Sequence, residues 1–252
     1  MRYQVAILSL LLLTSLSTYS YVPSQTPQDD SDKPVYHTTG NEANVVGTIS
    51  VTGTVPQPLS IDMSADHACT KLVRKLETEW FVTNKNKLQN VFVYLKGEPL
   101  QNYRFEVPTF EPILQHEKCR YSPHVMGLHV GQPLHIVNSD PTVHNTHPTP
   151  KVNQEWNFSQ PPHSPAVVKK FMRPEVVIPF KCNQHPWEKA YVGVLKHPYF
   201  AVSDELGRFE IRNVPPGVYK LVVWHEKLGE QERELTLLAG ENRSADFTLN
   251  AP

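Results

Sequence analysis

The sequence predicts an all-β protein made of β-sandwiches. From residue 43 onward, short runs that alternate apolar and polar residues recur roughly every ten residues, as in sandwich proteins. Turn-forming residues separate the later runs, at Asp204–Gly207, Pro215–Gly217 and Ala239–Asn242. No stretch of the sequence shows the 3.6-residue apolar period of an amphipathic helix.

The strand signals fall into three groups along the chain. Residues 44–55 and 88–95 form the first group, and five short runs between residues 200 and 249 form the last. In the middle group, Met126, Leu128, Leu134 and Ile136 share one parity on either side of a Gly131–Pro133 turn. This pattern predicts a β-hairpin with one buried face, and it places His129 on the opposite face, towards solvent.

The first 20 residues read as a signal peptide. Arg2 precedes an apolar run from Val5 to Leu16, which is shorter than the roughly 20 residues that a membrane-spanning helix needs. We therefore expect export to the periplasm or secretion, with no membrane span after signal cleavage; a plain N-terminal anchor is the alternative. Residues 21–42 are polar and proline-rich, which is typical of a flexible linker.

The charge composition argues against a nucleic-acid-binding protein. Without residues 1–20, the chain keeps 23 Lys and Arg against 25 Asp and Glu, a net charge of −2. Binding to a phosphate backbone needs clustered positive charge, and the sequence contains no such cluster. We expect no nucleic-acid partner. About 210 residues remain after the linker, enough for one large domain or two small ones.

The three cysteines predict one disulfide and one free thiol. An odd number in an exported chain leaves one thiol without a partner. Cys69 and Cys119 lie outside any motif with metal-ligand spacing, whereas Cys182 lies inside one. We therefore predict a Cys69–Cys119 disulfide and a free Cys182, with a different pairing as the alternative.

The motif around Cys182 predicts a metal centre. His185 follows Cys182 by three residues, directly after an apolar strand at residues 176–180, and His144 follows a second apolar strand upstream. A thiolate and two imidazoles with a variable fourth ligand form the donor set of a mononuclear copper site for electron transfer. The same side chains could instead hold a structural zinc ion.

These motifs resemble those of the cupredoxins, in particular plastocyanin-like exported bacterial proteins. The resemblance covers roughly residues 100–200 and rests on Asn138-Ser-Asp-Pro, Val143-His-Asn145 and Cys182-x-x-His-Pro-Trp187. It implies a Greek-key β-sandwich that holds one copper ion at one end through His144, Cys182 and His185.

The fourth ligand is where the sequence departs from these relatives. They usually carry Met after His-Pro-Trp, whereas this chain has Glu188. We expect Glu188 to be the fourth ligand, with a surface carboxylate as the alternative. The resulting donor set is similar to that of the red copper protein nitrosocyanin, although the glutamate of nitrosocyanin comes from elsewhere in the fold. We expect Asn145 to tether the two ligand loops, and Trp187 to form an apolar surface for a redox partner. His147 is expected to support the ligands or to add a donor, with an exposed histidine at a strand end near the site as the alternative.

The C-terminal part resembles the transthyretin-like and carboxypeptidase-regulatory-like β-sandwiches. The resemblance rests on Asp204-x-x-Gly-x-Phe-x-Ile and Val214-Pro-Pro-Gly-Val-Tyr-x-Leu, together with the early strands at Gly47–Val51 and Asn90–Leu95. It implies that a copper domain of residues 100–196 is inserted into a sandwich of residues 43–99 and 197–252. Two successive domains are the simpler alternative.

The sequence thus predicts an exported mononuclear copper protein that carries electrons between redox partners, such as a cytochrome or a dehydrogenase. A copper enzyme that binds a small molecule where Glu188 can be displaced is one alternative. A zinc-stabilised β-sandwich that serves adhesion or carbohydrate binding is another. We expect an electron carrier rather than an enzyme.

Overall fold

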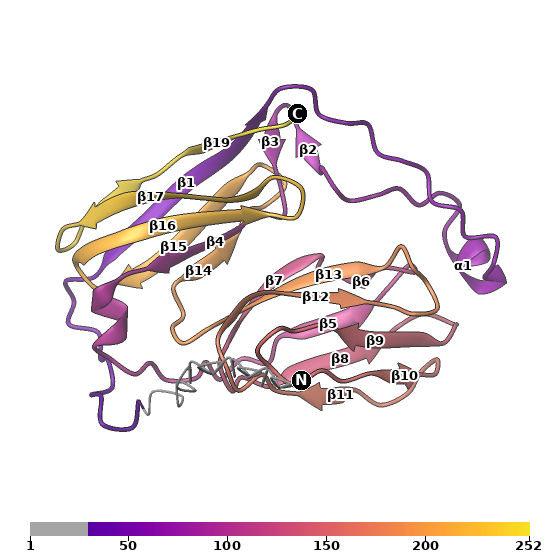
Figure 1. Cartoon of the computed structure of the whole chain (residues 1–252), viewed down its shortest axis with the longest axis horizontal. Coiled ribbons are helices and arrows are strands. Elements are labelled where there is room, and N and C mark those ends of the chain that lie inside the picture. Colours follow the sequence, from indigo (N-terminus) through magenta and orange to yellow (C-terminus); the bar gives the residue numbers. More distant parts are fainter. Residues whose placement is uncertain (1–29) are drawn as a thin grey trace, which may run out of the picture. The chain divides into compact units, whose positions relative to one another are not determined.

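Strands form nearly all of the regular structure in the computed structural model, which describes residues 30–252 (Figure 1). The described helices are the short α1 (His67–Leu72) and the 3-10 turn η1 (Glu98–Gln101). The all-β prediction is therefore confirmed. Among residues 30–252, no helix has the length and apolar character needed to cross a membrane. The predicted signal peptide and residues 21–29 of the predicted linker lie outside the described residues.

One sandwich, here the first sandwich, is formed by residues 113–195. Its larger sheet contains, in spatial order, β10 (Phe158–Gln160), β9 (His144–Pro148), β12 (Glu175–Lys181), β13 (Lys189–Leu195) and β7 (Val125–His129). The facing sheet contains β11 (Val167–Lys169), β8 (Leu134–Asn138), β5 (Ile113–His116) and β6 (Tyr121–Ser122). Apolar side chains from both sheets form one core, which includes Leu128, Ile136, Ile178 and Val192.

The predicted hairpin of residues 126–136 is wrong. β7 pairs with β13 in the larger sheet, whereas β8 pairs with β5 and β11 in the facing sheet. The turn at Gly131 therefore crosses from one sheet to the other, and Leu128 and Leu134 meet in the same core from opposite sides. Alternation of apolar residues reports a buried face, but it does not report which sheet a strand joins.

The other sandwich, here the second sandwich, combines strands from both ends of the described chain. One sheet contains β15 (Arg208–Val214), β1 (Ala43–Thr52), β3 (Lys87–Leu88) and β2 (Thr83–Asn84), and both β18 (Asn242–Ser244) and β19 (Phe247–Asn250) pair with β1. Its facing sheet contains β14 (Phe200–Val202), β4 (Phe92–Lys96), β16 (Gly217–His225) and β17 (Gly229–Leu237). β1 pairs with β15, and β4 pairs with β14 and β16, so strands before and after the first sandwich share these sheets. The inserted domain and its boundaries stay predictions.

Aromatic rings of the second sandwich pack on the outer face of β7 and β13. A Cβ atom on Gly127 would lie 2.2 Å from the Phe200 ring, and one on Gly193 would lie 2.3 Å from the Phe92 ring. These glycines therefore allow a close approach that no larger residue permits. His129 lies on the same outer face of β7 and is only 6% exposed. The prediction that His129 faces solvent is wrong, because the second sandwich covers this face.

Two further segments, which have few regular elements, are fixed to the rest of the chain. Within the predicted linker, Tyr36 bonds to the Arg104 backbone and packs against Tyr103 and Phe105, so it is fixed in place. The segment of residues 59–80 carries α1 and is joined to the first sandwich by a disulfide.

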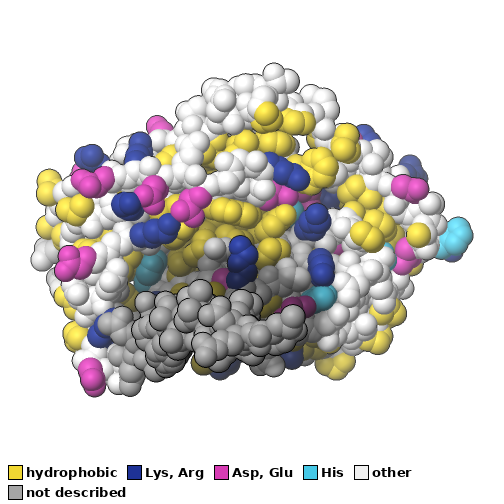
Figure 2. All heavy atoms as spheres, viewed as in Figure 1, with side chains coloured by type: hydrophobic (Ala, Val, Ile, Leu, Met, Phe, Trp, Pro, Cys, Tyr) yellow, Lys and Arg dark blue, Asp and Glu magenta, His cyan; other side chains and the backbone are white. Residues whose placement is uncertain are grey.

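On the face drawn in Figure 2, acidic and basic side chains of the described residues lie interspersed.

Candidate metal centre

The inward-facing side of three strands becomes polar at one end of the first sandwich. On β12, Ile178 and Phe180 point into the core, and Cys182 continues this parity just beyond the strand. His144 begins β9, where it is fully buried. On β5, His116 follows the buried Leu114 on the same parity. Strand alternation thus directs a thiol and two imidazoles towards one point.

The four predicted metal-binding residues come together there. His144, Cys182, His185 and Glu188 are all buried, and one potential ligand atom from each lies within 4.8 Å of the others. The short connection between β12 and β13 brings three of them into place. Its backbone is closed by hydrogen bonds from Glu188 N to His185 O (2.9 Å) and from Cys182 N to Glu188 O (3.4 Å).

Asn145 links the β9 side of this cluster to the Cys182 connection. Its backbone N–H donates to Cys182 Sγ at 3.3 Å, and its side-chain oxygen accepts from Asn183 N at 3.2 Å. Its amide nitrogen also donates to Phe158 O on β10 at 3.1 Å. The asparagine therefore holds the thiol in place beside the imidazoles, which is the geometry that the tethering role requires.

The two imidazoles face each other through their Nδ1 atoms. His144 Nδ1 and His185 Nδ1 lie 3.0 Å apart. Each ring bonds to a carboxylate through its other nitrogen, His144 Nε2 to Asp140 Oδ2 at 3.0 Å and His185 Nε2 to Asp66 Oδ2 at 2.9 Å. A carboxylate only accepts hydrogen bonds, so both Nε2 atoms donate. This arrangement orients the Nδ1 atoms towards the cluster, as carboxylate partners do for histidines that bind metals.

The two oxygens of Glu188 have different surroundings. Oε2 accepts a hydrogen bond from His116 Nδ1 at 2.7 Å. Oε1 lies within ion-pair distance of both other imidazoles, 2.9 Å from His144 Nδ1 and 3.2 Å from His185 Nδ1. The alternative of a surface carboxylate does not fit this residue, since Glu188 is 1% exposed.

The electrostatics of the cluster favour ionised ligands. Burial raises the pKa of Glu188, but the hydrogen bond from His116 and the two imidazoles beside Oε1 outweigh it, so that the pKa is lowered. Burial also opposes thiolate formation at Cys182, but His144 and His185 lower its pKa to about 7. The neighbouring anions, Asp140 first among them for His144, raise the pKa of both imidazoles despite burial. In the absence of metal, protons on the imidazoles balance the negative charge of the cluster.

Three residues around the cluster were not identified from the sequence: His116, Asp66 and Asp140. Asp140 belongs to the Asn138-Ser-Asp-Pro motif, which was a usable signal. Asp66 caps the N-terminus of α1, and its Oδ1 accepts from Ala68 N and Cys69 N. That signal predicts a cap but not a contact with His185, more than 100 residues away. His116 has no local motif, and only its parity with Leu114 indicates burial.

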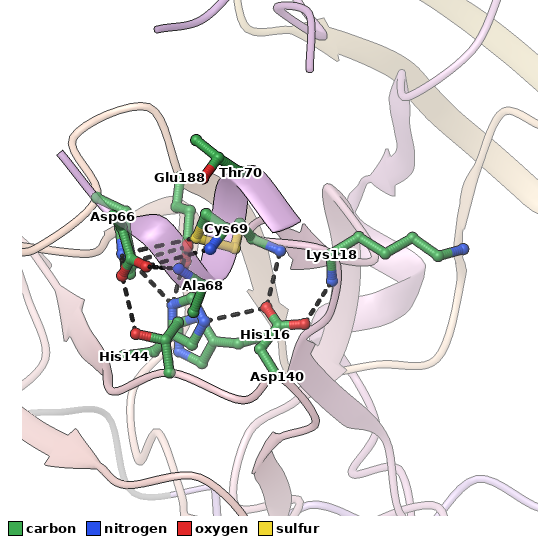
Figure 3. Close-up of a disulfide and its surroundings, with 12 residues drawn as sticks. Asp66, Ala68, Cys69, Thr70, His116, Lys118, Asp140, His144 and Glu188 are labelled. Carbon is green, nitrogen blue, oxygen red and sulfur yellow. Dashed lines mark hydrogen bonds and ion pairs between the residues drawn. A yellow bond between two sulfur atoms is a disulfide. The ribbon is translucent and has the colours of Figure 1, made fainter. Parts of the chain in front are cut away.

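A disulfide between Cys69 and Cys119 lies directly against the cluster (Figure 3). Cys69 Sγ is 3.8 Å from His185 Nε2, and Cys182 is the free cysteine of the described chain. Trp187 donates from Nε1 to Cys119 O at 2.9 Å, packs on the His185 ring, and lines a cavity of about 190 Å³.

His147 lies outside the cluster and pairs with Glu155 at 2.5 Å.

Comparisons with known proteins were made for sequence and for structure. Residues 182–250 match the family described as the carboxypeptidase regulatory-like domain. This match begins at Cys182, inside the segment predicted to be the copper domain. No curated protein matches the sequence.

Several solved structures are similar in fold to part of this chain. One is a Cu(I) amicyanin variant, with 22% identity, a TM-score of 0.30, and coverage of 35% of this chain and 86% of that one. Another is a purple cupredoxin from Nitrosopumilus maritimus, with 19% identity and a TM-score of 0.29; the match covers 33% of this chain and 98% of that one. A third is a copper-containing nitrite reductase from Thermus scotoductus SA-01, with 19% identity and a TM-score of 0.29; the match covers 39% of this chain and 27% of that one.

Proposed function

We propose that this protein binds one copper ion through His144, Cys182, His185 and Glu188 and carries electrons outside the cytoplasm. The observation that supports this most directly is the convergence of two imidazole Nδ1 atoms, a thiol and a carboxylate oxygen within 4.8 Å, all buried. Glu188 Oε1 lies 2.9 Å and 3.2 Å from the two Nδ1 atoms, so the carboxylate is directed at the same point as the imidazoles.

The chemistry of the donor set fits copper. Thiolate and imidazole are ligands that suit copper in both of its common oxidation states, and a trigonal set of two imidazoles and one thiolate is typical of electron-transfer sites. When bound, copper supplies a one-electron redox couple. The chain supplies a rigid, dry setting. His144 begins β9, the other three ligands lie in the short connection between β12 and β13, and all four are at most 2% exposed.

The negative charge around the cluster favours the oxidised ion. Cys182 and Glu188 would together balance the charge of Cu(II), and Asp66 and Asp140 add two further carboxylates behind the imidazoles. A more positive metal ion gains more from this field than a less positive one. We therefore expect a lower reduction potential than a neutral fourth ligand would give.

Export supports an electron-transfer role in the periplasm or in a secreted protein. Disulfides such as Cys69–Cys119 persist in oxidising compartments. We propose that the partner is a redox protein such as a cytochrome or a dehydrogenase. Trp187 is the partly exposed ring beside His185, and it is the surface group through which a partner could contact the ligand set.

Reconstitution with Cu(II) tests this function. The purified protein should take up one copper ion per chain and show an intense thiolate-to-copper absorption band. Cys182→Ser should abolish that band, because a hard oxygen replaces the thiolate. His147→Ala is the matched control, since His147 follows a ligand on β9 but lies outside the cluster. A native protein that carries zinc, or a Cys182→Ser variant that keeps the band, would sink the proposal.

A further inference from the structure

We infer that His116 is a positioning residue that restricts Glu188 to a single coordinating oxygen. The inference rests on the proposed copper site and adds a residue to it that contacts no metal itself. It follows from the unequal surroundings of the two carboxylate oxygens, Oε2 bonded to His116 and Oε1 directed at the other two imidazoles.

His116 is itself fixed on every side. It is fully buried, and its Nε2 lies 2.9 Å from Thr146 Oγ1. Its ring stacks on His144 with centroids 4.4 Å apart and an interplanar angle of 11°, and it packs on Tyr121 with centroids 4.3 Å apart. Two hydrogen bonds and two neighbouring rings confine the His116 side chain. The position of His116 therefore sets the position of the Glu188 carboxylate.

Hydrogen-bond logic assigns the tautomer of a neutral His116. An ionised carboxylate can only accept, so Nδ1 carries the hydrogen that bonds to Glu188. Nε2 then accepts from the Thr146 hydroxyl. The N–H directed at Oε2 is therefore set by the protein and does not depend on whether a metal is bound.

The consequence for coordination is specific. The bond to His116 occupies Oε2 and holds the carboxylate plane, so that only Oε1 faces His144 and His185. A carboxylate without this bond can bind a metal through both oxygens. His116 thus limits the number of oxygen ligands and withdraws charge from the one that remains.

His116→Phe tests this inference, because it removes the donor and keeps a ring between His144 and Tyr121. X-ray absorption of the copper-loaded variant should show one additional oxygen ligand, and electron paramagnetic resonance should show altered hyperfine splitting. The reduction potential should fall. Copper affinity should weaken roughly 10- to 100-fold, the usual effect of losing a partner that orients a ligand. His135→Phe is the matched control, since His135 also pairs with a glutamate, Glu111 at 3.2 Å, away from the site.

Two amide variants keep the test decisive if His116→Phe does not fold. His116→Asn places an N–H near the position of Nδ1 and should keep the wild-type spectra, whereas His116→Gln places it near Nε2 and should behave as His116→Phe. Identical coordination in all variants would overturn this inference and leave the proposed function unaffected. A wild-type protein without a thiolate-to-copper band would instead overturn the proposed function. If Glu188→Gln leaves the spectra unchanged while the band is present, Glu188 is no ligand and the inference fails.

Discussion

The two sandwiches differ in what they bury. Most of the buried polar and charged residues of the described chain belong to the first sandwich or to the connections between its strands, while the rest of the chain contributes His197, Ser203 and His225. The core of the second sandwich is otherwise apolar and aromatic. Since buried polar groups destabilise a fold unless they are fully paired, the stability of the first sandwich depends on the hydrogen bonds and ion pairs of its cluster. The second sandwich has the composition of a scaffold.

If this comparison is correct, the first sandwich should depend most on its covalent support. Removing the disulfide by the double substitution Cys69→Ser and Cys119→Ser frees a loop with a sequence separation of 50 residues. Chain entropy alone then predicts a loss of about 4 kcal/mol in the free energy of unfolding. Urea unfolding measures it. Because Asp66 on the same segment bonds to His185, the copper spectrum should change as well.

The control for this variant is Cys182→Ser, which alters the cluster and leaves the disulfide in place. It should lose the copper band without the loss of about 4 kcal/mol. An unfolding midpoint and a copper spectrum that both survive removal of the disulfide would show that the segment of residues 59–80 does not support the first sandwich.

The two sandwiches should also respond to acid in different pH ranges. Burial lowers the pKa of His225, which ends β16 of the second sandwich, to about 4. A histidine with a lowered folded-state pKa is neutral when folded, so its stabilising contribution is complete above pH 6.5 and is lost as the pH falls towards 4. Glu188 has a lowered pKa as well, but its contribution is lost only below its usual value near 4.5.

Between pH 6.5 and 4, stability should therefore fall through His225, whereas the Glu188 contribution is lost at lower pH. At about 1.4 kcal/mol per pH unit, the His225 contribution is of order 3 kcal/mol. His225→Asn keeps an acceptor near the position of Nδ1 for Lys227 N and cannot ionise, so it should reduce the pH dependence between 6.5 and 4. Glu188→Gln is the comparison variant and should leave the His225 contribution in that range unchanged. An unaltered slope in His225→Asn would contradict the assignment.

How far the sequence could predict this structure differs between local and long-range features. The ligand spacing of Cys182, His185 and Glu188 is local, and alternation along the preceding strand already directs Cys182 inwards. The strands of the second sandwich follow the predicted runs closely, because turns such as Pro215–Gly217 separate them clearly. These features depend on neighbours in the sequence.

The failures all concern contacts between distant segments. The hairpin prediction failed because β7 and β8 share a core without sharing a sheet. His129 was placed in solvent because nothing near it indicates that rings from β4 and β14 cover its face. His116 and Asp66 reach the cluster from other segments, 72 and 119 residues from their partners. Only the fold brings such residues together.

The smallest expected effect concerns a contact between the two sandwiches. The side chain of Glu226, in the second sandwich, is only 4% exposed. It accepts hydrogen bonds from His124 Nε2 at 2.6 Å and Tyr191 Oη at 3.0 Å, both in the first sandwich. Glu226→Gln keeps an acceptor oxygen but removes the charge. Because hydrogen bonds to charged groups contribute about 1.5–3 kcal/mol and neutral ones about 0.5–1.5, we expect a loss of about 1 kcal/mol in urea unfolding.

A matched surface variant separates this contact from a general effect of removing a carboxylate. Glu232 pairs with Lys220 at 2.5 Å on the exposed part of β16 and β17, where solvent screens the attraction between the two charges. Glu232→Gln should therefore change stability less than Glu226→Gln. The Glu226→Gln variant should also accelerate hydrogen exchange at the amides of Tyr191 and its neighbours, because they lie at the contact between the sandwiches. Equal effects of the two substitutions, with no change in exchange there, would mean that the first sandwich is held on the second by its aromatic contacts alone.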